Sequence, residues 1–287
     1  MQVLLLPDQL RSAWETVVSK QHSSDEFSKF QKEALEACRW IWQKALLLPG
    51  EEDLKRSLVV EISDYFGCDD LDQIQRHCER GAVRVADEWD SKVDPSSSRS
   101  IETFYDQSEA YIYDLMWWHT LVCDAAPLAY VLAMQFANQR GCKRYLDFGS
   151  GVGAGAILFA ANGFDVAMAD ISSTLLKFSQ WRLNRWNMPA ISIDLKTSKL
   201  PKNAFDIVTA MDVFEHLVDP VGTVEQLWLS MKTGGFLFGR FHAECDAGHP
   251  QHIITDFAPT LARMRELGLV EVWRDGWLWG HQIFQKM

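Results

Sequence analysis

The stretch from Lys143 to Ser172 constrains the fold of this chain more than any other part of the sequence. Residues 144–148 form a short apolar run that predicts a buried strand. A glycine-rich loop follows, and without a Cβ the glycines let the backbone approach a ligand closely. The small apolar residues 154–161 predict a helix that packs close to a sheet, and 164–169 predict a second strand. The stretch therefore predicts a strand–loop–helix–strand unit.

An acidic residue stands just past the second predicted strand of this unit. The loop glycines are Gly149, Gly151 and Gly153, and the acidic residue is Asp170. A carboxylate about 20 positions after such glycines binds ribose hydroxyls in nucleotide-binding units. We therefore expect an adenosine-bearing cofactor here, with Asp170 and the adjacent Ile171 in contact with it.

The type of cofactor depends on the residue before the loop. The glycines loosely fit the dinucleotide pattern G-x-G-x-x-A, so an NAD-type oxidoreductase is one interpretation. However, Asp147 lies two residues before Gly149, where a carboxylate would repel a pyrophosphate near the helix N-terminus. Asp147 suits a ligand with a cationic amine or a sulfonium instead.

The pattern D-x-G-x-G-x-G from Asp147 to Gly153, followed by Asp170, resembles the class I S-adenosylmethionine-dependent methyltransferases. Residues 205–211 predict a strand that runs into Asp212-Val-Phe-Glu215-His216-Leu-Val-Asp-Pro220. This segment is similar to its counterpart in methyltransferases related to ubiquinone-biosynthesis O-methyltransferases, where a Glu-His pair opens the next helix. The resemblance covers roughly residue 104 to the C-terminus and implies that S-adenosylmethionine is the cofactor.

The rest of the C-terminal half fits the same fold. A helix is expected over 172–185 and a strand over 191–195; a helix over 223–231 is predicted to end at Lys232-Thr-Gly234-Gly235, before a strand over 236–241. Asp275-Gly276 predicts a two-residue hairpin between strands 269–274 and 277–286. The expected fold is α/β: a Rossmann-like, seven-stranded, mainly parallel sheet with an antiparallel C-terminal hairpin and an N-terminal helical cap.

The first part of the chain predicts only helices, over 7–20, 24–48, 51–66 and 71–89, the last broken at Gly81. Residues 93–100 read as a linker, so we divide the chain into a helical module, 1–98, and a methyltransferase domain, 99–287. A further interpretation is a non-catalytic protein whose helical module mainly binds a partner. That protein would expose a large apolar patch, whereas an enzyme would close the module over the pocket.

The resemblance also implies residues around the ligands. Small-molecule methyltransferases carry an aromatic-rich helix before the glycine loop, expected here over 102–119, which covers the cofactor and walls the substrate pocket. Tyr105 is assigned to the cofactor, and Tyr113, Trp117 and His119 to the substrate. Position in the family also assigns Asp194, Asp212 and Val213 to the cofactor, although Asp194 can equally be a solvated turn residue and Asp212 can contact the substrate instead.

Methyl transfer is an in-line displacement that depends on placing the acceptor beside the methyl carbon, and any acceptor proton must be removed. Neutral imidazoles suit that task, and we select His216, His249 and His252 as candidate bases, with a structural role at the start of the next helix as the alternative for His216. His242 is expected near the substrate, and residues 240–252 as a polar loop over the pocket. Their spacing matches no fixed metal signature, so no metal is assigned.

Charge and cysteine content narrow the partners. The net charge of −11 and pI near 5.2 argue against a nucleic-acid partner, which needs a basic surface. No apolar run approaches the roughly 18 residues of a membrane span, and neither a signal peptide nor a cysteine framework is visible. We expect a cytoplasmic enzyme acting on a small molecule of undetermined acceptor atom, and the sequence leaves open whether it forms a homodimer.

Overall fold

A seven-stranded sheet forms the centre of the molecule. The computed structural model describes residues 24–121, 126–241, 249–274 and 280–287. The strands lie in the order β3-β2-β1-β4-β5-β7-β6. The first five pair in parallel, whereas β7 is antiparallel to both β5 and β6. Their bounds are β1 Arg144–Phe148, β2 Asp165–Asp170, β3 Ala190–Asp194, β4 Phe205–Ala210, β5 Met231–Gly239, β6 Leu269–Arg274 and β7 Gln282–Lys286.

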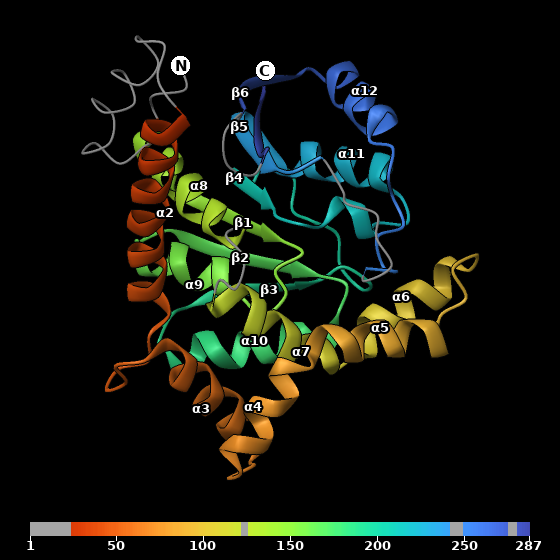
Figure 1. The fold of residues 1–287 in the computed structure, drawn as a ribbon. Coiled ribbons are helices and arrows are strands. Elements are labelled where there is room, and N and C mark those ends of the chain that lie inside the picture. Colours follow the sequence, from red (N-terminus) through yellow and green to blue (C-terminus); the bar gives the residue numbers. More distant parts are fainter. Residues whose placement is uncertain (1–23, 122–125, 242–248, 275–279) are drawn as a thin grey trace.

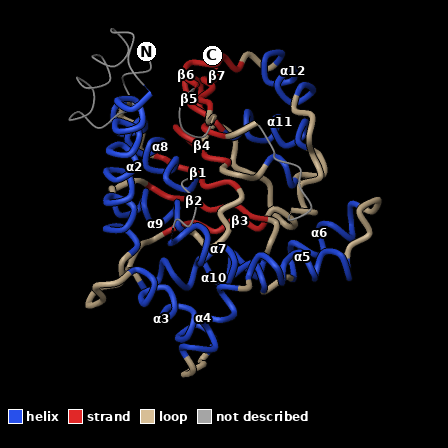
Figure 2. The backbone as a smooth tube through the Cα atoms, viewed as in Figure 1, coloured by secondary structure: helices blue, strands red, loops and turns tan. Residues whose placement is uncertain are grey.

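Helices flank the sheet on both sides (Figure 1), and the strands run between them through the centre (Figure 2). The helices of the described residues are α2 Ser24–Leu46, α3 Leu54–Phe66, α4 Leu71–Glu79, α5 Gly81–Lys92, α6 Ser98–Gln107, α7 Ala110–Leu115, α8 Ala129–Gln139, α9 Ala154–Ala161, α10 Ser173–Arg185, α11 Pro220–Ser230 and α12 Ala258–Glu266. The described residues also contain a π-helical turn, Met116–Thr120, and two 3₁₀ turns, Ala126–Leu128 and Phe214–His216. None of the described helices combines the length and apolar character needed to cross a bilayer.

Alternate residues of the central strands point into two separate cores, because successive side chains of a strand face opposite sides. On one face, Tyr145 and Ile207 pack with α2, α8 and α9. On the other face, the next residues along the same strands, Leu146 and Val208, pack with α11 and α12. The two cores cover the faces of the sheet. A ligand can therefore bind at the carboxyl ends of the parallel strands, as is usual in open α/β sheets.

The helices α3 to α7 share a third core with the glycine-loop unit. Leu58 of α3, Val85 of α5 and Ile112 of α7 are buried in the same cluster as Val152 of the loop and Phe178 of α10. Gly81 begins α5 where a Cβ would lie 2.5 Å from the Cα of Asp114, so α5 and α7 cross in close contact. The N-terminal helices therefore pack directly against the segment that follows β1.

The expected sheet and its antiparallel C-terminal hairpin are confirmed, and so are the bounds of strands 144–148 and 269–274. The break at Gly81 is also observed. The proposed turn at Asp275-Gly276 and the helix over 7–20 lie outside the described residues. Because Arg274 pairs with Gln282, the connection between β6 and β7 is longer than a two-residue turn.

Three expected element boundaries were wrong. The helix over 102–119 is interrupted, because Ser108 ends α6 with an extended backbone. The Lys232–Gly235 segment does not terminate a helix: α11 ends at Ser230, since Met231 is extended and begins β5. The Glu-His pair lies in a 3₁₀ turn rather than in a helix, and α11 starts later, at Pro220, where the side chain of Asp219 accepts from the Gly222 N–H.

Candidate active site

The glycine loop turns sharply between β1 and α9. Gly149, Gly151 and Gly153 have φ angles of +69°, +51° and +74°, a region that residues with a Cβ rarely adopt. A Cβ on Gly149 would lie 2.4 Å from Cγ2 of Val213. Gly149 and Gly151 line a cavity at the carboxyl edge of the sheet, whereas Gly153 lies behind it against Ser179. The first two glycines thus give a ligand access to the loop backbone.

Asp170 holds the loop from the tip of β2. Its Oδ2 accepts from the Gly151 N–H at 2.9 Å, and its Oδ1 accepts from the Ser172 N–H at 2.9 Å. Burial raises the pKa of Asp170, although these backbone N–H groups oppose the shift. A carboxylate offers about four acceptor positions. Asp170, which lines the cavity with its neighbour Ile171, therefore keeps acceptor capacity for a ligand.

Asp147 lies beneath the loop rather than on the cavity wall. Its side chain is fully buried, and its Oδ1 accepts from the hydroxyls of Tyr130 and Thr209, both at 3.1 Å. Burial raises the pKa of Asp147 to about 7. The cavity lining contains the neighbouring Phe148 instead. In this structure Asp147 supports the start of the loop, and its predicted contact with a cationic ligand group stays a prediction.

The next two strand ends differ in their relation to the cavity. Asp194 lies off the cavity wall, where its Oδ1 accepts from the Lys196 N–H, and Leu195 lines the cavity in its place. Asp212 and Val213 both line the cavity. Asp212 has a φ of +49°, and one of its oxygens lies 3.4 Å from Nε of Arg240.

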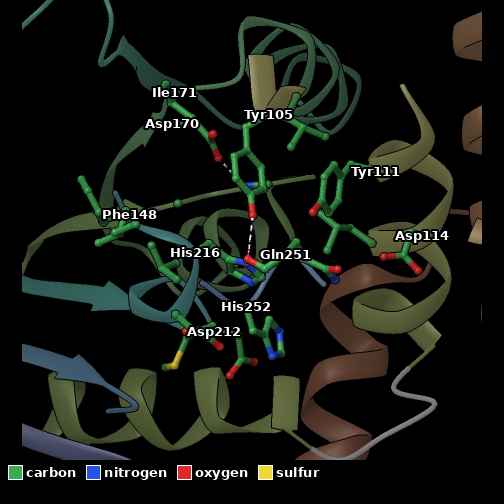
Figure 3. Close-up of a pocket in the computed structure, with 18 of the residues that line it drawn as sticks. Tyr105, Tyr111, Asp114, Phe148, Asp170, Ile171, Asp212, His216, Gln251 and His252 are labelled. Atoms are coloured by element: carbon green, nitrogen blue, oxygen red, sulfur yellow. Dashed lines mark hydrogen bonds between the residues drawn. The ribbon is translucent and has the colours of Figure 1, made fainter. Parts of the chain in front are cut away.

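Tyr105, His216 and Gln251 form a hydrogen-bonded cluster on the wall of the cavity (Figure 3). The hydroxyl of Tyr105 lies 3.0 Å from Nδ1 of His216 and 3.3 Å from the carbonyl oxygen of Gln251. The same carbonyl lies 3.1 Å from Nδ1 of His216. Because a carbonyl oxygen only accepts, Nδ1 carries the proton, and the lone pair of the neutral imidazole is on Nε2.

Burial, and next the neighbouring His252, lower the pKa of His216 to about 3. The imidazole is therefore neutral near pH 7, and it is a weak base in this environment. The three predicted histidines do come together. The ring centroids of His216 and His252 are 4.8 Å apart, and those of His252 and His249 are 5.0 Å apart.

Glu215 completes a group with the geometry of a metal site. Atoms of Glu215, His216 and His252 that can serve as ligands lie within 4.8 Å of one another. Glu215 is 1% exposed, and its buried Oε2 has no hydrogen-bond partner among the residues that the structure describes. Burial, and next the charge of Asp212, raise the pKa of Glu215 to about 8. No metal is expected from the sequence, yet this group can hold a cation.

The far side of the cavity is aromatic and acidic. Trp117 and His119, both predicted for the substrate, line it together with Trp118 and Tyr111. Asp114 also lines it, and burial raises the pKa of this carboxyl to about 6.

Two predicted substrate residues are not placed on this wall. The ring of Tyr113 stacks on Phe66, with centroids 5.4 Å apart, and Tyr113 does not belong to the cavity lining. His242 lies outside the described residues.

The whole cavity measures about 930 Å³. Cys78, Glu79 and Ala82 from α4 and α5 contribute to its wall, as do Ile101 and Tyr105 from α6. The N-terminal helices therefore close over the pocket, as the sequence analysis expected for an enzyme. A cavity of this size falls within the range of cofactor and ligand sites.

Sequence reasoning missed three contributors. Glu215 was noted in its motif but given no role, although its position beside His216 was the available signal. Asp114 is an acidic residue in an aromatic segment. The sequence does not say which side of this helix faces the cavity, so the position of Asp114 on the cavity wall becomes visible only in the fold. Gln251 acts through its backbone carbonyl, for which no side-chain pattern exists.

Comparison with known proteins identifies the family. A family described as "Methyltransferase domain" matches residues 117–275, more than half of the chain. Two ubiquinone biosynthesis O-methyltransferases are similar over 100 residues: that of Nitrosomonas europaea is 29% identical, and that of Nitrosospira multiformis is 32% identical. Each match covers 33% of this chain and 42% or 41% of the relative, so it spans less than half of those proteins.

Among solved structures, a SAM dependent methyltransferase from Aquifex aeolicus is 17% identical with a TM-score of 0.44, over 67% of this chain and 97% of that one. The match of the family over residues 117–275 includes the glycine loop, Asp170 and the Glu215-His216 pair. The chain therefore belongs to the methyltransferase domain family, within the class I S-adenosylmethionine-dependent methyltransferases that its motifs resemble.

Proposed function

We propose that this protein transfers a methyl group from S-adenosylmethionine to a small organic molecule. The observation that carries the proposal is that one cavity contains both Asp170 at the glycine loop and the Tyr105–His216 cluster. A cofactor at the loop and an acceptor near the cluster would share the same enclosed space. The acceptor atom is not assigned.

The residues present fit the cofactor. Asp170 has acceptor capacity for the two ribose hydroxyls, and the positive φ angles of Gly149 and Gly151 let the cofactor approach the loop backbone. Phe148, Ile171 and Leu195 offer apolar surface to a flat ring. S-adenosylmethionine, when bound, supplies a methyl group on a positively charged sulfur.

The charge of the cavity also favours a cationic cofactor. Asp170, Asp212 and Asp219 are carboxylate groups of the wall, and Arg240 is the single Lys or Arg among the described lining residues. A cation therefore enters a site of predominantly acidic groups, whereas the pyrophosphate of NAD would be repelled. This supports methyl transfer over the oxidoreductase interpretation.

A direct comparison tests this proposal. S-adenosylhomocysteine should raise the melting temperature of the purified protein, because a ligand that binds only the folded state stabilises it. NADH at the same concentration should not. Stabilisation by NADH alone would overturn the proposal in favour of the oxidoreductase.

As a second part of the proposal, we infer that Glu215, His216 and His252 bind a divalent cation. The Nδ1–H of His216 is directed to a backbone carbonyl, which is how metal-binding histidines are commonly oriented. The neutral state of this imidazole is the one that a metal requires. For an acceptor that is a hydroxyl, a cation here would favour its ionisation, which the weakly basic His216 does poorly.

The cation is tested by thermal unfolding after chelation and dialysis. Mg²⁺, Mn²⁺ and Zn²⁺ are then added one at a time. At least one of them should raise the melting temperature of the chelated wild type, and it should not raise that of Glu215→Gln. His249→Gln is the control, since His249 lines the cavity outside the three-residue group. Equal stabilisation of the wild type and Glu215→Gln by every cation would contradict a site at these residues.

We also place the protein in the cytoplasm as part of this proposal. The support comes from its thiols: the cysteines of the described residues, Cys38, Cys68, Cys78 and Cys142, are free. Reduced cysteines are usual in cytosolic proteins.

A further inference from the structure

The side chain of Arg182 is fully buried beneath the glycine loop. Arg182 belongs to α10, and its guanidinium donates in two directions. Nε and Nη2 donate to Oε2 of Glu61, at 3.2 Å and 2.9 Å. Nη1 donates to the carbonyl oxygen of Val152 at 2.7 Å. Arg182 therefore joins α3 to the loop that follows β1.

Glu61 is the only acidic partner that the described residues give this guanidinium, and it is also fully buried. Its second carboxylate oxygen, Oε1, accepts from Nε1 of Trp186 at 3.0 Å. Taking two charges out of water costs free energy, which such a pair recovers only with good geometry and further hydrogen bonds. The Glu61–Arg182 pair has the short contacts and the further hydrogen bonds that this recovery requires. It therefore restrains the groups that are bonded to it.

Val152 occupies a critical point of the loop, between two glycines in left-handed conformations. Its carbonyl is held from below by Arg182, while the preceding residue, Gly151, donates its N–H to Asp170. The two anchors restrain two peptide groups of the loop that are separated by a single peptide group. Together with the backbone bonds from Gly149 and Ser150 to Ala169 and from Gly153 to Ser150, these anchors restrain glycine backbones that could otherwise rearrange.

We propose that Glu61 and Arg182 are positioning residues that hold the glycine loop in its cofactor-binding shape. The helix α3 would thereby form part of the cofactor site without touching the cofactor, and the N-terminal helices would have a second role besides closing the pocket. This inference rests on the proposed binding of S-adenosylmethionine at the loop.

The same two helices carry a matched control. Nη1 of Arg185 on α10 lies 2.7 Å from Oδ2 of Asp64 on α3. These side chains are 32% and 45% exposed, so this ion pair lies at the surface, and Val152 is bonded to Arg182 instead. Removing the surface pair alters the contact between α3 and α10 but leaves the loop anchor in place.

Three altered proteins separate positioning from simple stability. Glu61→Gln weakens the hold on Arg182 while keeping an acceptor oxygen. The double variant Glu61→Met with Arg182→Met replaces the buried pair by apolar side chains, an exchange that is often neutral for stability. It removes the donor to Val152. The double variant Asp64→Asn with Arg185→Met is the control.

Calorimetric titration with S-adenosylhomocysteine, well below the melting temperature of each protein, gives the first readout. The buried double variant should bind about tenfold more weakly or worse, as expected for a lost charge-assisted hydrogen bond. Glu61→Gln should show a smaller loss in the same direction, and the surface double variant should bind like the wild type. Wild-type affinity in the buried double variant would overturn the inference.

Hydrogen exchange of the loop amides, 149–153, without any ligand gives the second readout. Each protein is measured at a temperature that lies equally far below its own melting temperature. Under that condition the loop amides should exchange faster in the buried double variant than in the surface double variant. Unchanged exchange would mean that Arg182 does not hold the loop. This measurement remains informative if the wild type fails to bind S-adenosylhomocysteine, a result that would contradict the proposed function instead.

Discussion

The carboxylate of Asp170 accepts a hydrogen bond from the Gly151 N–H at 2.9 Å. This contact joins the end of β2 to the loop that follows β1, across neighbouring parallel strands. It also aligns the carboxylate with the loop backbone at the cavity wall. The geometry of the loop predicted to bind the cofactor can therefore be tested on the protein alone.

Replacing Gly149 by alanine should destabilise the protein. The new Cβ would meet Val213 at 2.4 Å on a backbone with a φ of +69°. Backbone strain and overpacking together should lower the free energy of unfolding by about 2–4 kcal/mol, measured by urea denaturation. Gly163→Ala is the control, because Gly163 has a φ of +80° but open space around it. It should cost only the backbone strain, about 1–2 kcal/mol. Equal losses in both variants would show that Val213 does not restrict the loop.

Asp147 should make stability depend on pH. Its folded-state pKa of about 7 exceeds the ordinary value of 3.8, so the folded protein binds a proton that the unfolded chain releases. The resulting stability is complete below pH 3.8 and is lost as the pH rises through about 7. Between pH 5.5 and pH 8 the wild type should lose about 2 kcal/mol more than Asp147→Asn in urea unfolding without cofactor. Asp165→Asn, at the exposed start of β2, should behave like the wild type. Identical slopes for the wild type and Asp147→Asn would disprove a raised pKa.

Tyr105→Phe should reveal what the hydroxyl of Tyr105 does. It removes a hydroxyl that lies within hydrogen-bond distance of both His216 and the carbonyl of Gln251, and the loss of one buried hydrogen bond should cost about 1 kcal/mol of unfolding free energy. The affinity for S-adenosylhomocysteine should change little, because this hydroxyl is directed at His216. A large loss of affinity would instead support the sequence assignment of Tyr105 to the cofactor.

Much of the fold could be predicted because its signals are local. Residues 144–148 and 269–274 are runs whose strand character needs no partner to be recognised, and both were given their observed bounds. Asp170 was placed correctly at a strand tip because its distance from the glycines follows from the strand–loop–helix–strand unit. The errors arose where tertiary contacts decide. Ser108 breaks a helix without glycine or proline, and Gly234 and Gly235 lie within β5 because the strand already pairs with β4 at Met231 and resumes that pairing at Phe236.

The site was predictable only in part for the same reason. Tyr113 was assigned to the substrate on the same helical segment as Trp117, but it faces Phe66 and the N-terminal helices. Which side of α7 meets the cavity depends on how α5 crosses it, and no pattern within the segment contains that information. The buried link from Glu61 to Arg182 joins residues 121 positions apart, so it becomes visible only in the folded chain.

Calorimetric titration of S-adenosylhomocysteine into the wild type, Asp170→Ala and Asp194→Ala tests the central claim most directly. The wild type should bind, and Asp170→Ala should bind more than about tenfold more weakly, because charged hydrogen bonds to the ligand and to the loop are lost. Asp194→Ala should retain the wild-type affinity, since Asp194 lies off the cavity wall. The absence of binding heat for the wild type up to millimolar ligand, or equal affinity of the wild type and Asp170→Ala, would contradict a cofactor site at the glycine loop.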